Sequence, residues 1–97
     1  MTKIIWSPKA IKSLDCLVIF LSKKWEYKVV EVLLNEIDAT LIRIRKFPFL
    51  YPIYSQKKKL RKCVIKKRTL LFYRATSEEI QIMQIVDARQ NPKNYKI

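Results

Sequence analysis

The side chains that could do chemistry in this 97-residue chain are almost all cations. Lysine and arginine number 21 against 8 aspartate and glutamate residues, which gives a formal net charge of +13. The densest run has eight cations within twelve positions: Lys57, Lys58, Lys59, Arg61, Lys62, Lys66, Lys67 and Arg68. Such a surface favours a polyanion through counterion release or an acidic protein through electrostatic steering, and the alternative is a basic face that is only solvated.

The residue types that are missing exclude several classes of site. The chain has no His and no Gly. Without His it lacks the usual general base at neutral pH and the commonest metal ligand, which argues against a Ser-His-Asp triad and a structural zinc. Without Gly it cannot form a Walker A loop, a dinucleotide-binding fingerprint or a nucleophile elbow. We therefore expect no cofactor and no metal.

The two cysteines and the N-terminus indicate in which cellular compartment the protein is found. Cys16 and Cys63 form no CxxC pair, and we predict two buried, reduced side chains, the alternative being one disulfide between them. No signal-peptide core opens the chain, and no segment approaches the roughly 18 apolar residues of a membrane span. We expect one cytoplasmic domain over residues 1–97 with no membrane partner.

Hydrophobic periodicity predicts the elements that must position the cations. Residues 3–6 have the composition of a strand, and Ser7-Pro8 is a good helix start. Apolar residues at spacings of three and four then predict two amphipathic helices between residues 8 and 46, with a polar connection at residues 22–24. Phe47-Pro48 ends the second helix. Three strand-length runs follow, at residues 60–65, 69–75 and 80–86.

The predicted fold is therefore α+β in the order β-α-α-β-β-β, an antiparallel sheet with a helical hairpin packed on one face. The run 69–75 is apolar on both faces, which is typical of a central strand. Residues 47–54 form an aromatic loop that either stacks nucleic-acid bases or folds back over a small core, and we favour the second. Trp6 and Trp25 are expected to pack in the core or the hairpin.

At this point the sequence resembles the RelE/ParE superfamily of toxins from bacterial type II toxin–antitoxin systems. The resemblance runs nearly end to end and depends on the order of many short motifs. Its carriers are Ile5-Trp6-Ser7-Pro8, Ala10, Leu14, Trp25, Phe47-Pro48, Tyr51-Pro52, Arg61-Lys62, Val64-Ile65, Leu71-Phe72-Tyr73-Arg74 and Ala88-Arg89-Gln90-Asn91-Pro92. The resemblance implies the same fold that periodicity predicts.

Two activities are implied by this resemblance. RelE-type members cut mRNA in the ribosomal A site, whereas ParE-type members poison DNA gyrase without cutting RNA. Only the first would make this chain an enzyme. Both types are neutralised by an antitoxin whose extended C-terminal segment wraps the toxin, so the implied partner is a cognate acidic antitoxin in a hetero-oligomer.

For the ribonuclease, the resemblance implies Arg61, Arg89 and Tyr95 as catalytic residues. Such a site needs help in removing a 2′-OH proton, cations on the scissile phosphate and a group that orients a base. Two further basic positions of that site fall on Cys63 and Leu70 in this chain, so the set is incomplete. Arg89 could instead cap a strand end.

The gyrase interpretation is favoured because the helical hairpin is long and the set of catalytic residues is incomplete. Our hypothesis for the target contact names Arg61, Lys62, Arg74 and Arg89. A third class stays open, a basic nucleic-acid-binding module without toxicity. It would differ from a toxin in leaving growth unaffected and in having no small acidic gene beside it.

Overall fold

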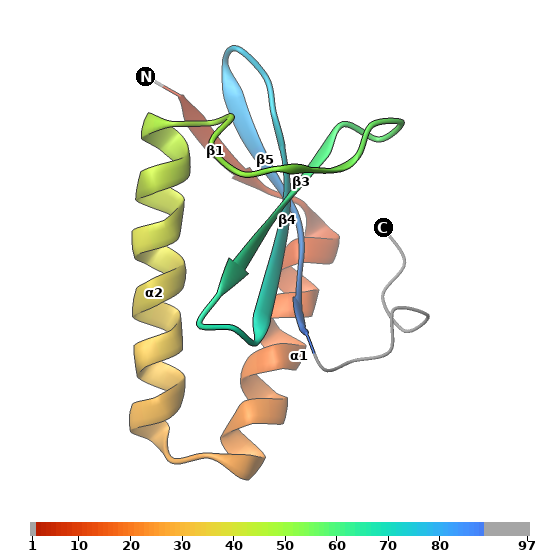
Figure 1. The fold of residues 1–97 in the computed structure, drawn as a ribbon. Coiled ribbons are helices and arrows are strands. Elements are labelled where there is room, and N and C mark those ends of the chain that lie inside the picture. Colours follow the sequence, from red (N-terminus) through yellow and green to blue (C-terminus); the bar gives the residue numbers. More distant parts are fainter. Residues whose placement is uncertain (1, 89–97) are drawn as a thin grey trace.

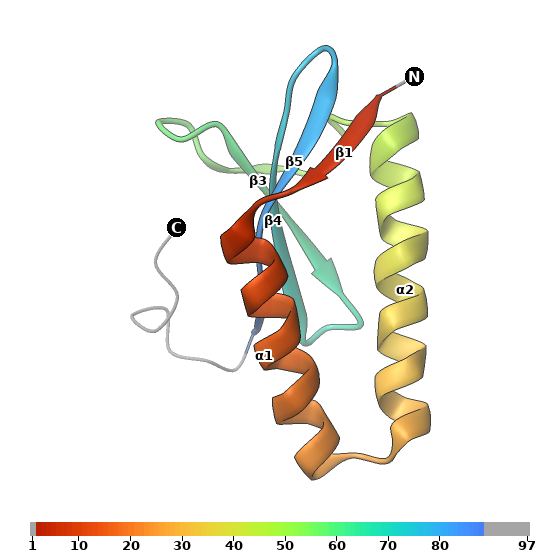
Figure 2. The same ribbon diagram turned by 180° about the vertical axis from the view of Figure 1, so that it is seen from behind.

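The computed structural model describes residues 2–88. Its elements are β1 (Lys3–Trp6), α1 (Pro8–Lys24), α2 (Tyr27–Lys46), β2 (Ile53–Ser55), β3 (Leu60–Ile65), β4 (Thr69–Ala75) and β5 (Glu79–Asp87). The strands form one sheet in the spatial order β1-β5-β4-β3-β2, and the helical hairpin covers one of its faces (Figures 1 and 2). The expected α+β fold with a helical hairpin is confirmed.

The sheet differs from the expected one in two details. β1 pairs with β5 in parallel, from Lys3↔Glu79 to Trp6↔Ile82, so the sheet is mixed and not wholly antiparallel. The aromatic loop also contributes a short strand, β2, which pairs with β3. This segment is too short and too rich in proline to show the alternation that identifies a strand. β4 is the central strand, as its apolar composition predicts.

The helices begin and end for local reasons. The Ser7 hydroxyl oxygen accepts a hydrogen bond from the Ala10 amide (3.0 Å), which caps α1 in front of Pro8. α1 runs through the polar residues 22–24, where a connection was expected, because cations at a helix C-terminus are stabilised by the helix dipole. The turn between the helices lies instead at Trp25 and Glu26. Neither helix in the described part of the chain has the length and apolar composition that spanning a membrane requires.

Ser7, the N-cap of α1, and Ser13 within α1 cover the part of β5 that β1 leaves unpaired. Beyond Ile82, no strand among residues 2–88 pairs with the outer side of β5. There the Ile85 amide donates to the Ser13 hydroxyl oxygen (3.0 Å), and the Ser7 hydroxyl donates to the Met83 carbonyl (3.2 Å). These bonds hold α1 against the sheet and satisfy edge groups that would otherwise be open to another chain.

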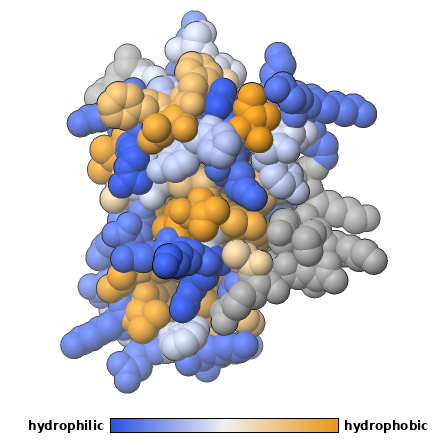
Figure 3. All heavy atoms as spheres, in the orientation of Figure 1, coloured by the Kyte–Doolittle hydropathy of each residue, from blue (hydrophilic) through white to orange (hydrophobic). Residues whose placement is uncertain are grey.

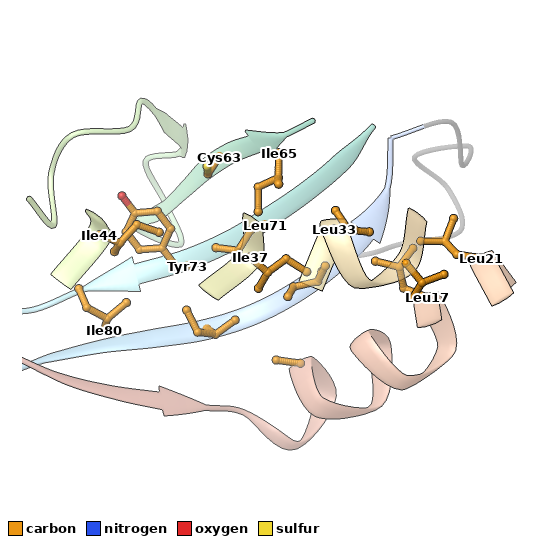
Figure 4. Close-up of a cluster of buried hydrophobic side chains, with 14 residues drawn as sticks. Leu17, Leu21, Leu33, Ile37, Ile44, Cys63, Ile65, Leu71, Tyr73 and Ile80 are labelled. Atoms are coloured by element: carbon orange, nitrogen blue, oxygen red, sulfur yellow. The ribbon is translucent and has the colours of Figure 1, made fainter. Parts of the chain in front are cut away.

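The core lies between the helical hairpin and the sheet (Figure 4). Leu17 and Leu21 of α1 and Ile37 of α2 belong to it together with Leu71 and Tyr73 of β4. The opposite face of the sheet, which neither helix covers and which we call the open face, has a smaller cluster of buried residues: Leu70, Phe72 and Val86. The apolar spacing of the first helix predicts a buried stripe of Ile11, Leu14, Val18, Leu21 and Trp25. Leu14, Val18 and Leu21 belong to the core, whereas Ile11 and Trp25 are exposed.

The β3–β4 hairpin closes through a turn made by two lysines. Lys66 and Lys67 have φ angles of 53° and 61°, and the Arg68 amide donates to the Ile65 carbonyl (3.2 Å). Positive φ at both central residues is typical of a type I′ turn, which normally has Asn-Gly at these positions. Lysine has a Cβ atom that crowds the backbone in this region, so the turn is strained.

We expect the substitutions Lys66→Asn and Lys67→Gly together to raise the free energy of unfolding by about 1–2 kcal/mol, because they relieve this strain. The half-exposed ion pair between Lys66 and Glu36 (3.9 Å) is lost, but such a pair contributes little. Urea unfolding followed by circular dichroism measures the difference.

The matched control is Lys57→Asn with Lys58→Gly in the β2–β3 turn. Neither of these lysines has a positive φ, so this variant should gain nothing. Equal stability of the two double variants would contradict the strain argument.

Candidate functional site

The three predicted target-binding cations that the structure describes do not share one face of the sheet. Successive side chains of β3 point to opposite faces of the sheet, so Arg61 lies on the same face as Cys63. Cys63 belongs to the core under the helices, which places Arg61 on the helix-covered face. Lys62 therefore belongs to the open face. Arg74 follows Tyr73 of the core on β4 and also belongs to the open face. The proposed set is split between the two sides.

Arg89 and Tyr95, the other predicted catalytic residues, lie outside the described residues 2–88. Of that set, Arg61 is the member that the structure describes.

The Arg61 guanidinium is held against the aromatic loop. Its Nη1 donates to the Tyr51 carbonyl (2.7 Å) and to the Phe49 carbonyl (3.3 Å). The same group lies over the Phe49 ring, 5.0 Å from its centre. A guanidinium bound in this way fixes the backbone of the loop and has less freedom to meet a phosphate, so its first effect is to position residues 49–51.

Beside it lies a cluster of polar groups at the end of the core. The Tyr73 hydroxyl donates to the Pro48 carbonyl (2.9 Å), and the Arg43 Nη1 donates to the Tyr51 hydroxyl (3.0 Å). The Tyr51 and Tyr73 rings meet edge to face at 6.5 Å. These contacts join α2, the loop and β4.

Burial governs the ionisation of this cluster. It raises the pKa of Tyr73 to about 12, although Arg61 opposes the rise. Burial also raises the pKa of the Cys63 thiol, against the hydrogen bond with Tyr51 and the charge of Arg43. The pKa of Tyr51 is raised by burial as well. Because all three groups stay protonated at neutral pH, none of them can act there as a general base.

The aromatic loop does not cover the core as expected. Tyr51 is the large apolar residue of the loop that packs against the core cluster. The other large side chains remain exposed by 44–62 %: Phe47, Phe49, Leu50, Ile53 and Tyr54. In Figure 3 apolar atoms gather along the upper edge of the molecule, where this loop crosses the sheet in Figure 1.

The open face combines cations with an aromatic side chain. The Lys62 ammonium lies 5.5 Å from the centre of the Tyr54 ring, whose edge meets Phe72 at 4.9 Å. The Arg74 guanidinium donates to the Lys58 carbonyl (3.1 Å). It also donates to the Gln81 side chain (3.4 Å). Arg74 therefore ties the β2–β3 turn to the sheet, and Lys62 is the predicted cation that is more open to a partner.

A groove that sequence reasoning missed lies between the helical hairpin and the β3–β4 turn. It has a volume of about 380 Å³ and an apolar floor. The floor and rim are formed by Leu21, Val29, Val32, Leu33, Lys28, Lys66 and Arg68. The Arg68 guanidinium lies 5.0 Å from the centre of the Trp25 ring, which fixes it at one end. Val29 and Val32 lie off the buried face of α2, to which Val30 and Ile37 belong, and these exposed valines are the signal in the sequence that could have indicated this groove.

The cysteines do not form a disulfide, and the two differ in environment. Cys63 is buried as predicted, whereas Cys16 is exposed on α1, so the prediction for Cys16 was wrong. Cys16 lies off the buried face of its helix, which is set by Ala10, Leu17 and Leu21. Within residues 2–88 no three side chains of the His, Cys, Asp or Glu type gather closely enough to hold a metal ion.

Comparison with solved structures supports the fold. The chain matches a structure described as the chromosomal ParDE TA system from P. aeruginosa, with 16% identity, 92% of this chain and 98% of that chain covered, and a TM-score of 0.75. It matches the conserved hypothetical protein HP0894 from Helicobacter pylori, with 26% identity, 90% and 94% coverage, and a TM-score of 0.56. It also matches YafQ from E. coli strain BL21(DE3), with 15% identity, 90% and 93% coverage, and a TM-score of 0.60.

No curated protein sequence matches the chain at a significant level. The family described as ParE toxin of type II toxin-antitoxin system, parDE, matches residues 4–92. This match covers nearly the whole chain, including both helices and every described strand residue except Lys3, the first of β1. The chain therefore belongs to the ParE toxin family of type II toxin–antitoxin systems, within the RelE/ParE superfamily.

Proposed function

We propose that this toxin inhibits DNA gyrase and that a cognate acidic antitoxin neutralises it. The observation that carries the proposal is the burial of Cys63 and Leu70, which are 2 % and 8 % exposed. The resemblance to the ribonuclease branch implies basic residues at these two positions. A buried thiol with a raised pKa and a buried leucine cannot stabilise charge on a phosphate. The sequence also has no His to act as the general acid.

The long helical hairpin supports the same choice. α1 and α2 have 17 and 20 residues. The ParE-type branch that the sequence resembles tends to have longer helices than the ribonuclease branch, and the family match is to ParE. A gyrase-directed role would put the protein in the cytoplasm.

The groove beside the β3–β4 turn supports an acidic, amphipathic antitoxin segment. Apolar side chains of such a segment would be buried against Val29 and Val32, and its carboxylates would meet Lys28, Lys66 and Arg68 at the rim. Val32 is about half exposed in the free chain. Similar folds occur in toxin–antitoxin complexes, including the DinJ-YafQ complex of E. coli. We infer a hetero-oligomer of toxin and antitoxin.

Our candidates for the target contact are still Arg61, Lys62, Arg74 and Arg89. If the chain is instead a ribonuclease, the candidates for catalysis are Arg61, Arg89 and Tyr95. The contacts of Lys62 and Arg74 on the open face support a direct role for the first and a supporting role for the second. The contacts of Arg61 support an indirect role through the loop.

Induced expression in E. coli tests the toxin function. We expect arrested growth with an induced DNA-damage response, because a poisoned gyrase leaves broken DNA, while protein synthesis continues at first. Coexpression of the small acidic gene beside the toxin gene should restore growth. Unaffected growth would contradict the proposal and favour the non-toxic nucleic-acid-binding module. Immediate loss of protein synthesis with cleaved mRNA would favour the ribonuclease.

A further inference from the structure

Residues 47–54 form a loop that side chains of three elements hold in place through its backbone and through Tyr51. Tyr73 of β4 donates to the Pro48 carbonyl, and Arg61 of β3 donates to the Phe49 and Tyr51 carbonyls. From α2, Arg43 donates to the Tyr51 hydroxyl. A loop fixed at several points loses little conformational entropy when it binds a partner.

The loop nevertheless leaves its large apolar side chains in water. Phe49 and Leu50, at the tip, are 62 % and 55 % exposed, and Phe47 is 59 % exposed. Ile53 and Tyr54 extend the exposed surface towards β3. Several large, exposed apolar side chains on a loop that is held in place mark a contact site, and aromatic side chains are enriched at the centres of such sites.

The surroundings of the loop indicate what kind of molecule it contacts. Cations border it: Arg45 and Lys46 at the end of α2, and Lys57, Lys58 and Lys59 in the β2–β3 turn. The complementary surface is an apolar pocket with an acidic rim. Arg61 covers one face of the Phe49 ring, and Lys62 lies over a face of the Tyr54 ring. Ring faces occupied by cations are less available for base stacking, which favours a protein over a single-stranded nucleic acid.

We propose that residues 47–54 are the element with which this toxin docks into an apolar, acid-rimmed pocket of its protein target. This inference rests on the proposed function in requiring a protein target, but it does not require that the target be gyrase. It assigns to Arg61 the role of a positioning residue, which holds the docking loop and does not itself carry the contact.

The docking loop is separate from the groove that we assign to the antitoxin. The loop follows the C-terminal end of α2, whereas the groove contains residues 28–33 near its N-terminal end. Figure 1 shows the loop and the β3–β4 turn at opposite ends of the sheet. Substitutions in the loop should therefore impair action on the target and leave antitoxin binding intact.

The experiment compares Phe49→Ser/Leu50→Ser with a control of matched exposure, Ile11→Ser/Ile19→Ser on α1, whose side chains are 52 % and 58 % exposed. Growth arrest on induction, melting temperature and binding to purified gyrase holoenzyme are measured for both. We expect the loop variant to lose growth arrest and to bind gyrase at least about 30-fold more weakly, as when central interface residues are removed. The control should arrest growth, and both variants should melt close to the wild type.

The single variant Phe47→Ser provides a second probe of the same loop, and it too should weaken growth arrest. Full growth arrest by the loop variants would overturn the docking proposal. It would also be overturned if the wild type bound a single-stranded RNA oligonucleotide tightly and the loop variant lost only that binding. If the wild type arrests growth without binding gyrase, and the loop variant does not arrest growth, the gyrase target is wrong while the docking loop stands. If the wild type leaves growth unaffected, both proposals fail.

Discussion

Replacing Leu71 with Ala is expected to lower the free energy of unfolding by about 3 kcal/mol, because it removes a buried side chain and leaves a cavity. Leu71 is fully buried in β4, the central strand of the five. It belongs to the cluster that joins both helices to the sheet, so its loss weakens the packing on which the whole fold depends (Figure 4). Urea unfolding of the purified protein measures the change.

Val64→Ala is the matched control for this substitution. Val64 lies in the neighbouring strand β3, opposite Leu70, and is 52 % exposed. Truncation of a side chain that is already half in water should cost less than about 1 kcal/mol. A Leu71→Ala variant that is no less stable than Val64→Ala would contradict the assignment of the core.

Stability should also fall at alkaline pH because of Tyr73. Its pKa is raised to about 12 in the folded protein, mainly by burial, whereas the unfolded chain has the ordinary value of 10.0. Above pH 10 the unfolded state therefore releases this proton and the folded state retains it. The stabilisation is fully present below pH 10 and decreases as the pH rises towards 12. The total loss expected from this one group is about 2–3 kcal/mol.

Tyr73→Phe separates this effect from the titration of the many lysines. The variant loses the hydrogen bond to the Pro48 carbonyl, which costs about 1 kcal/mol at every pH below 10. Between pH 10 and 12 its stability should fall less steeply than that of the wild type, and the two curves should cross, because the wild type loses about 2–3 kcal/mol from an initial advantage of about 1 kcal/mol. Parallel curves over this range would show that Tyr73 ionises in the same range in both states.

Much of the fold could be predicted from the sequence because apolar periodicity decides it. β3 and β4 begin and end at the predicted residues, since each is a short apolar run between polar turns. The second helix ends at Lys46, before Phe47-Pro48, because proline restricts the residue that precedes it. These signals are local, and the surrounding structure reinforces them.

The features that the sequence did not reveal depend on contacts between distant segments. The parallel pairing of β1 joins the first and last strands of the sheet. The positive φ angles of Lys66 and Lys67 are imposed by a tight hairpin in a chain without glycine. Likewise, the role of Arg61 depends on the loop ten residues earlier, which folds back onto its guanidinium.

The structure shows where the predicted cations within residues 2–88 lie, whereas their part in function stays a prediction. The basic half of the chain does carry the cations, but the structure divides Arg61 from Lys62 and Arg74. The loop 47–54 was expected to cover the core, but in the structure it is held in place and most of its large apolar side chains are exposed. We infer that cations and the apolar loop act together, with charge steering the encounter and the loop supplying the close contact.

The most direct test of the proposed function is one purified toxin sample in two assays side by side. The first assay contains DNA gyrase and supercoiled plasmid, and the second is a cell-free translation reaction with a defined mRNA. The gyrase proposal predicts cleaved plasmid in the first assay only when gyrase is present, and intact mRNA in the second. Intact plasmid together with ribosome-dependent cleavage of the mRNA would contradict it.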